Sequence, residues 1–286
     1  MPTKIVDIHP HIVSTDAEKY PITPLEGKQS EWSKKRSVDF EQMIAAMDEA
    51  GVEKAALVHS STTYGYDCSY LADCVAKLPH RVTGVFSVNM MADDAAEKIN
   101  YWANEKKLGG LRLYTSGATI ETQSTWMTDP KTFPGMECAQ GLGLSVCVSL
   151  RKPGLPQLNE LVRLFPKIRF LVDHMVEPPI NEEPPYTGSQ FLFDLAQYDN
   201  MYLKMTTLNV RNSKKDNGSP EIFFPLLVNK FGASRIAWGS NYPSAQGSLK
   251  EMVEEAQSVL GCLSEQDREW IFARTAQSLY PALADK

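Results

Sequence analysis

The stretch Lys4-Ile-Val-Asp-Ile-His-Pro-His11 shows the pattern from which the fold of this chain is predicted. Residues 4–8 form a short, mostly apolar run that predicts a buried strand, and two histidines stand at its exit. The next regular segment, residues 39–50, has helical periodicity. Asp39 and Gln42 predict a capping box at its start, and Gly51 predicts its end. The start of the chain therefore predicts a strand followed by a helix.

This unit recurs to the end of the chain. The other predicted strands comprise residues 54–58, 82–88, 111–114, 145–149, 169–172, 201–204 and 235–238. The other predicted helices comprise residues 67–78, 93–106, 132–141, 155–165, 189–196, 221–231, 248–261 and 265–274. Because the strands lie too far apart for hairpins, we expect them to be parallel and joined by crossover helices.

Eight strand–helix units are the number found in a closed (β/α)8 barrel, or TIM barrel. We therefore predict an α/β protein in which residues 1–286 form a single barrel domain. A doubly wound open sheet is the alternative, because periodicity does not reveal whether a sheet closes. Two connections are unusually long, residues 12–36 after the first strand and the proline-rich residues 177–186 after the sixth. We interpret both as loops over a site, with surface decoration as the alternative.

Composition limits the possible partners. Hydrophobic residues make up 43% and charged residues 22% of the chain, the balance of a protein with a sizeable core. A net charge of -6 and a pI near 5.5 argue against binding to nucleic acid or to an anionic membrane. Neither a signal peptide nor a membrane span is indicated, and the five cysteines are scattered. We therefore expect a cytoplasmic protein with reduced thiols.

Three histidines are the predicted reactive groups. His9 and His11 stand two residues apart at a strand end, where alternate side chains share a face, so we expect them to converge. His174 ends the sixth predicted strand and would face the same opening of a barrel. Three imidazoles suit Zn or a related divalent metal with a position left for water. His59, at the end of the second strand, is a further candidate for the pocket.

Three short motifs in this order resemble those of the amidohydrolase superfamily. They are Asp7-x-His9-x-His11, Asp173-His174 and the stretch Gly239-Ser240-Asn241-Tyr242-Pro243 after the eighth strand. The chain is most similar to the amidohydrolase-2 branch of lactonases and decarboxylases, which includes 2-pyrone-4,6-dicarboxylate lactonase, and the resemblance spans almost the whole sequence. It implies a barrel fold, an active site at the barrel mouth built on the three histidines, and hydrolysis of small carboxylate-bearing lactones.

Asn241 departs from this family pattern. The family places an aspartate here, which acts as a metal ligand or as the base, whereas an amide cannot take up a proton near neutral pH. Either His9, His11 and His174 hold one divalent metal, Zn or Mn, or no metal binds and His174, with a pKa of about 6.5, is the base. We favour the site without metal, because losing the carboxylate weakens metal affinity. An engineered substitution is a third explanation of Asn241.

Cationic and aromatic residues near the strand ends are candidates for substrate binding. Arg112 in the fourth strand and Lys204 at the end of the seventh each suit a carboxylate, and the alternative is an internal ion pair with Asp173. Arg211 would bind a second carboxylate, and the aromatic candidates include Tyr114 and Tyr242. We therefore expect a small carboxylate as ligand; whether the chain forms a homo-oligomer is left open.

The leading function predicted from the sequence is ring opening of a small lactone or cyclic amide by water, in which Asn241 and the histidines contact the reacting groups. Decarboxylation of an aromatic acid without an oxidant and isomerisation of a sugar lactone are alternatives that use the same site. A non-catalytic barrel that binds a ligand is an alternative of another class, because it would explain the loss of the aspartate.

Overall fold

Eight short strands form one parallel sheet in this computed structural model, which describes residues 4–285. In chain order they are β1 (Val6–Asp7), β2 (Lys54–Val58), β3 (Val82–Phe86), β4 (Gly110–Tyr114), β5 (Ser145–Ser149), β6 (Arg169–Val172), β7 (Met201–Thr206) and β8 (Ile236–Gly239). Each strand pairs with the next, and the Ile8 amide donates to the Trp238 carbonyl at 3.3 Å, which joins the last strand to the first. The predicted (β/α)8 barrel is confirmed, and the open doubly wound sheet is wrong.

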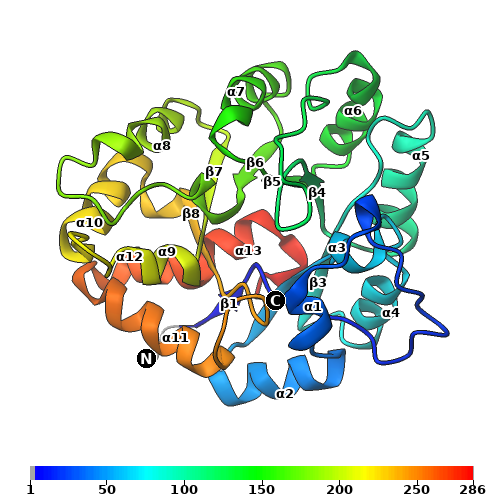
Figure 1. Cartoon of the computed structure of the whole chain (residues 1–286), viewed down its shortest axis with the longest axis horizontal. Coiled ribbons are helices and arrows are strands. Elements are labelled where there is room, and N and C mark those ends of the chain that lie inside the picture. The colour runs from blue at the N-terminus through cyan, green and yellow to red at the C-terminus, as the bar shows by residue number, and fades with distance from the viewer. Residues whose placement is uncertain (1–3, 286) are drawn as a thin grey trace.

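Helices surround the strands (Figure 1). They are α1 (Glu31–Lys35), α2 (Phe40–Ala50), α3 (Ser61–Tyr64), α4 (Ser69–Lys77), α5 (Ala95–Asn100), α6 (Phe133–Gly141), α7 (Leu155–Leu164), α8 (Gln190–Asp194), α9 (Thr207–Asn212), α10 (Pro220–Phe231), α11 (Leu249–Val259), α12 (Glu265–Glu269) and α13 (Thr275–Leu279). The capping box predicted between Asp39 and Gln42 is present at α2. No helix within residues 4–285 is long and apolar enough to cross a bilayer.

Several predicted boundaries shift. The helices predicted for residues 93–106 and 265–274 begin as α5 and α12 and then continue as π-helical turns, Tyr101–Glu105 and Trp270–Arg274. The short helix α9 was not predicted, because its residues are weak helix formers and it depends on a capping box between Thr206 and Asn209. Strand β7 is two residues longer than predicted, and this changes the position of Lys204.

The barrel interior is closed at its amino-terminal end. Small and apolar side chains of the strands meet there, and they pack on Ala276, Leu279 and Tyr280 of the last helical region. The Tyr280 phenol lies 3.3 Å from the Cys147 thiol inside the barrel. Figure 1 shows α13 near the centre of the ring of strands. Because this end is filled, only the carboxyl ends of the strands open to solvent, as is usual for barrel enzymes.

The first and last strands are held together directly beneath this opening. The Asp7 carboxylate accepts hydrogen bonds from the backbone amides of His9 and Ser240, at 2.9 and 2.8 Å. Gly239 permits the close approach, since a β-carbon at this position would lie only 2.6 Å from the β-carbon of His9. The backbone of His9 is therefore fixed by residues that lie more than two hundred positions away in the sequence.

Candidate active site

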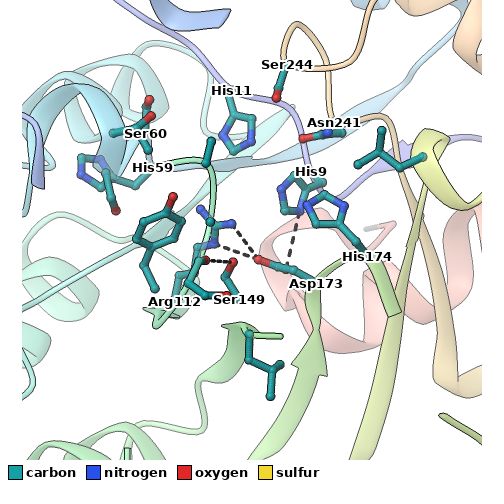
Figure 2. A pocket seen from close by; sticks show the side chains of 18 of the residues that line it. His9, His11, His59, Ser60, Arg112, Ser149, Asp173, His174, Asn241 and Ser244 are labelled. Atoms are coloured by element: carbon teal, nitrogen blue, oxygen red, sulfur yellow. Dashed lines mark hydrogen bonds and ion pairs between the residues drawn. The ribbon is translucent and has the colours of Figure 1, made fainter. Parts of the chain in front are cut away.

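A cavity of about 290 Å³ opens at the carboxyl ends of the strands. This volume is near the lower limit of small-molecule sites, which begin at roughly 300 Å³. Charged and polar residues from six of the strand ends line it (Figure 2): His9, His11, His59, Arg112, Ser149, Asp173, His174 and Asn241. Trp32, from the long connection after β1, and Glu177, from the connection after β6, also contribute.

The structure brings the three predicted histidines together. The ring centroids of His9 and His11 are 4.9 Å apart, and those of His9 and His174 are also 4.9 Å apart. His9 therefore lies between the other two rings, and Asn241 lies beside them (Figure 2). The backbone of Asn241 is left-handed, with φ of 60°, a conformation that asparagine tolerates better than most residues.

Two of the imidazoles have a tautomer that the backbone determines. His11 Nδ1 lies 2.9 Å from the Val58 carbonyl oxygen, and His59 Nε2 lies 3.0 Å from the Gly65 carbonyl oxygen. A carbonyl oxygen only accepts, so the bonded nitrogen carries the proton. Burial lowers the pKa of His11 to about 3 and that of His59 to about 4, so both rings are neutral near pH 7. Each therefore keeps one nitrogen lone pair.

His9 and His174 are also neutral. Burial, with the nearby charge of Lys204, lowers the pKa of His9 well below its usual value. Among the described residues neither of its ring nitrogens has a hydrogen-bond partner, although Nδ1 lies 3.6 Å from Asp173 Oδ1. Burial lowers the pKa of His174 to about 4, although the neighbouring Asp173 opposes this shift. The ordinary pKa expected for a base at His174 is therefore not found. The neutral ring remains an acceptor, but a weak one.

A buried ion cluster supports the imidazoles. Asp173 Oδ2 lies 2.9 Å from Arg112 Nε and 2.8 Å from Arg112 Nη2, and Asp173 Oδ1 lies 3.0 Å from Lys204 Nζ. Burial disfavours the ionised carboxyl, but the two cations outweigh it and hold the pKa of Asp173 far below its usual value. Two cations therefore share one directly contacting carboxylate beneath the rings, and the buried carboxyl of Asp7 also lies within electrostatic range of Lys204. The ring of Tyr114, predicted as a substrate contact, lies 5.0 Å from the Arg112 guanidinium and lines the cavity.

Three predicted substrate contacts lie away from the cavity. Lys204 is fully buried in the barrel interior, where it binds Asp173 and lies 3.3 Å from the Cys147 sulfur, so the internal ion pair is the arrangement found. Arg211 belongs to α9 and pairs with Glu255 of α11 at 2.7 Å. Tyr242 packs against the apolar core. None of these three residues is among those that line the cavity, so the structure does not bring them to the predicted site.

Arg151 is a cavity residue that sequence reasoning missed. Its guanidinium donates to the backbone carbonyls of Glu121 and Gly117, and within residues 4–285 no carboxylate lies in ion-pair range of it. The side chain lines the cavity near the end of β5. The signal was available, since Arg151 follows the predicted strand 145–149 by two residues, and His9 and His11 follow the predicted strand 4–8 by one and three residues.

The residues around the cavity do not fit a divalent metal. Three imidazoles are a suitable donor set for zinc, but no group of three or more His, Cys, Asp or Glu side chains between residues 4 and 285 has an arrangement that would hold a metal ion. Asp173, the nearest carboxylate, is already bound to Arg112 and Lys204. The two cations of this cluster, Arg112 and Lys204, would also repel a metal ion.

Comparison with known proteins assigns the family. The family model for amidohydrolases, Amidohydro_2, matches residues 6–282, so this chain belongs to that amidohydrolase family and is a hydrolase. The resemblance noted from the three motifs is thereby confirmed. An L-fucono-1,5-lactonase of Burkholderia ambifaria is 26% identical over 206 residues, which cover 72% of this chain and 69% of that protein.

Two solved structures share the fold over nearly their whole length. One, from Pseudomonas putida, is named as a 2-pyrone-4,6-dicarboxylic acid hydrolase; it has a TM-score of 0.79, 20% identity and full coverage of both chains. The other is an amidohydrolase of Burkholderia multivorans with bound zinc, with a TM-score of 0.75, 19% identity and coverage of 97% of this chain and 99% of that one. At these identities the likeness shows the fold alone.

Replacing Asp173 tests the ion cluster. Asp173→Asn leaves Arg112 and Lys204 without a counter-charge in the interior, so we expect a loss of about 3–5 kcal/mol in the free energy of unfolding at pH 7. Asp173 has a lowered folded pKa, so its contribution is full above the unfolded pKa of about 3.9 and is lost as the pH falls below it. Urea titrations from pH 7 to pH 3 measure both effects.

The matched control is Asp94→Asn, which removes an exposed carboxylate from a pair with Lys98 on one helix. Such a pair contributes about 0.3–0.5 kcal/mol. Equal losses for the two variants at pH 7 would contradict the role given to the buried cluster.

Proposed function

We propose that this protein hydrolyses a small lactone that carries a carboxylate, by attack of water on the lactone carbonyl. The observation that carries the proposal is the presence of neutral imidazoles together with the cationic side chains of Arg112 and Arg151 in one cavity. Lactonase activity in a relative at 26% identity supports the reaction class. The preference for a substrate that carries a carboxylate rests on a cationic residue of this chain, Arg151.

Arg151 is the proposed receptor for the carboxylate. Its side chain lines the cavity, and among the described residues its guanidinium hydrogen-bonds to backbone carbonyls alone, so its positive charge is available to a ligand. A planar guanidinium binds a carboxylate through two parallel hydrogen bonds. The cavity volume of about 290 Å³ suits a single ring with short substituents.

The imidazoles and Arg112 are proposed to handle the reacting groups. Water that attacks the carbonyl donates hydrogen bonds to the free nitrogen of His11 or His174, and the positive charge of Arg112 stabilises the oxyanion that develops. An imidazole with a pKa of about 4 is a weak proton acceptor, but once protonated it is a strong acid. It therefore returns the proton readily to the ring oxygen that leaves when the lactone opens.

Asn241 is proposed to orient the water or the carbonyl with its amide. An amide both donates and accepts hydrogen bonds without changing charge, so it preserves the neutral state of the neighbouring rings. A carboxylate at this position would raise the pKa of those rings and would repel the substrate carboxylate. Because the residues do not fit a divalent cation, the proposed mechanism assigns no step to a metal.

Hydrolysis of matched lactones tests the proposal. We expect turnover of a six-membered lactone with carboxylates, 2-pyrone-4,6-dicarboxylate, in preference to unsubstituted δ-valerolactone. Arg151→Ala should raise KM for the carboxylated lactone by roughly 10–100-fold, because a hydrogen bond to a charged group contributes about 1.5–3 kcal/mol, while kcat stays nearly unchanged. The exposed Arg163 provides the control: Arg163→Ala should change neither constant.

Other outcomes separate the alternatives. Release of carbon dioxide from a hydroxybenzoate would favour the decarboxylase, and a rearranged lactone without ring opening would favour the isomerase. Preference for a hydroxylated sugar 1,5-lactone, with no effect of Arg151→Ala, would contradict the carboxylate but leave lactone hydrolysis standing. No turnover by the natural chain, together with a large gain in Asn241→Asp, would favour a barrel that only binds its ligand.

The pH dependence of kcat/KM follows from the lowered pKa of His174. The neutral ring accepts a hydrogen bond, so activity should persist from neutral pH to about pH 5 and fall as the ring is protonated near pH 4. Rates corrected for spontaneous hydrolysis, with circular dichroism to verify folding at each pH, measure this. An acid limb at pH 6–7 would show that the ring keeps an ordinary pKa.

Metal removal should have little effect. Protein purified without chelator is expected to contain well below one equivalent of zinc or manganese, and dialysis against EDTA should leave lactone hydrolysis unchanged. Elemental analysis measures the content. A stoichiometric ion that disappears in His174→Ala, but not in the exposed control His80→Ala, would show that the three imidazoles do hold a metal.

A further inference from the structure

His174 belongs to a backbone turn of unusual geometry. His174, Met175, Val176 and Glu177 all have positive φ, of 54°, 55°, 62° and 48°. Non-glycine residues rarely adopt this conformation, and a β-branched residue such as Val176 adopts it least readily. A turn of this kind persists only where its surroundings fix it. The Asn209 amide Nδ2 donates to the His174 carbonyl at 2.8 Å and provides one such constraint.

The orientation of the Asn209 amide is fixed by two backbone groups. Nδ2 faces the His174 carbonyl, which only accepts, and Oδ1 faces the Thr206 backbone amide, which only donates, at 2.9 Å. Exchange of the two amide atoms would break both hydrogen bonds. Oδ1 is therefore the acceptor that Asn209 presents to its other neighbour, the Thr206 hydroxyl, at 3.3 Å.

The Thr206 hydroxyl has one proton and two side-chain neighbours, and it also accepts from the backbone amide of Asn209 in the capping box. His174 Nδ1 is 2.8 Å away and Asn209 Oδ1 is 3.3 Å away. If the hydroxyl donates to Asn209, it accepts from a protonated His174 Nδ1, and both contacts are hydrogen bonds. If it donates to His174 instead, it faces Asn209 Oδ1 with no proton between them. Only the first arrangement uses both contacts.

We propose that Thr206 and Asn209 are positioning residues that hold His174 in the tautomer with the proton on Nδ1 and the lone pair of Nε2 directed to the cavity. Neither residue is among those that line the cavity, and both are buried, so they act through His174. The Val58 carbonyl selects the same tautomer for His11. Both rings therefore present acceptor nitrogens to a water molecule. The catalytic consequence rests on the proposed function; the tautomer itself does not.

The tautomer is measured directly by nuclear magnetic resonance on the full chain labelled with 15N-histidine. The chain has five histidines, and His174→Gln identifies the signals of His174. We expect a proton on Nδ1 in the natural protein and in Thr206→Ser, which retains the hydroxyl. Thr206→Val has the same shape without the hydroxyl and should lose this preference. A proton on Nε2 of His174 in the natural protein overturns the proposal, whether or not any variant folds.

Enzyme kinetics provide a second test of the positioning role of Thr206. Replacing a group that orients a reactive histidine typically costs about 10–100-fold in activity, so kcat for the lactone should fall by this factor in Thr206→Val, with KM within about threefold, and recover in Thr206→Ser. A lower melting temperature in Thr206→Val with the tautomer and kcat unchanged would mean that the hydroxyl only caps α9, and would overturn the proposal. Absence of turnover in the natural protein contradicts the proposed function alone, because the spectrum still reports the tautomer.

Discussion

The buried carboxylate of Asp173 is the group on which the rest of the site depends. It holds Arg112 at the cavity wall and Lys204 in the barrel interior. The charges of these two cations help to keep the surrounding imidazoles neutral and oppose the binding of a metal ion. The ionisation of the histidines therefore depends on cations that Asp173 holds in place.

Periodicity in the sequence was sufficient to predict the barrel and the meeting of His9, His11 and His174, because strand ends of a parallel barrel share one opening. Lys204 was misplaced for a definite reason. The predicted strand ended at this residue, whereas β7 continues to Thr206, so Lys204 lies below the rim and faces inward. Arg211 was expected to bind a second carboxylate of the ligand, but it lies on α9 and pairs with Glu255 of α11. Neither error is visible without tertiary contacts.

The pKa values also lay beyond sequence reasoning, since they follow from burial and from charges contributed by distant strands. Membership of the amidohydrolase family gives the reaction class. Asn241 stands where the resemblance to that family implied an aspartate. The arrangement of the imidazoles around Asn241 is compatible with an amide in place of the expected aspartate. An uncharged amide leaves the rings neutral, and two of the rings have backbone carbonyls that already select which nitrogen is free.

The contacts between the two ends of the barrel have a consequence for synthesis of the protein. Asp7 of β1 bonds to Ser240, and Tyr280 fills the floor beneath the same strands. A chain still emerging from the ribosome lacks these partners until the segments that contain Ser240 and Tyr280 have been translated. The pocket therefore forms only after β8 is available, and shorter nascent chains have an open sheet edge at which strands of other chains can pair.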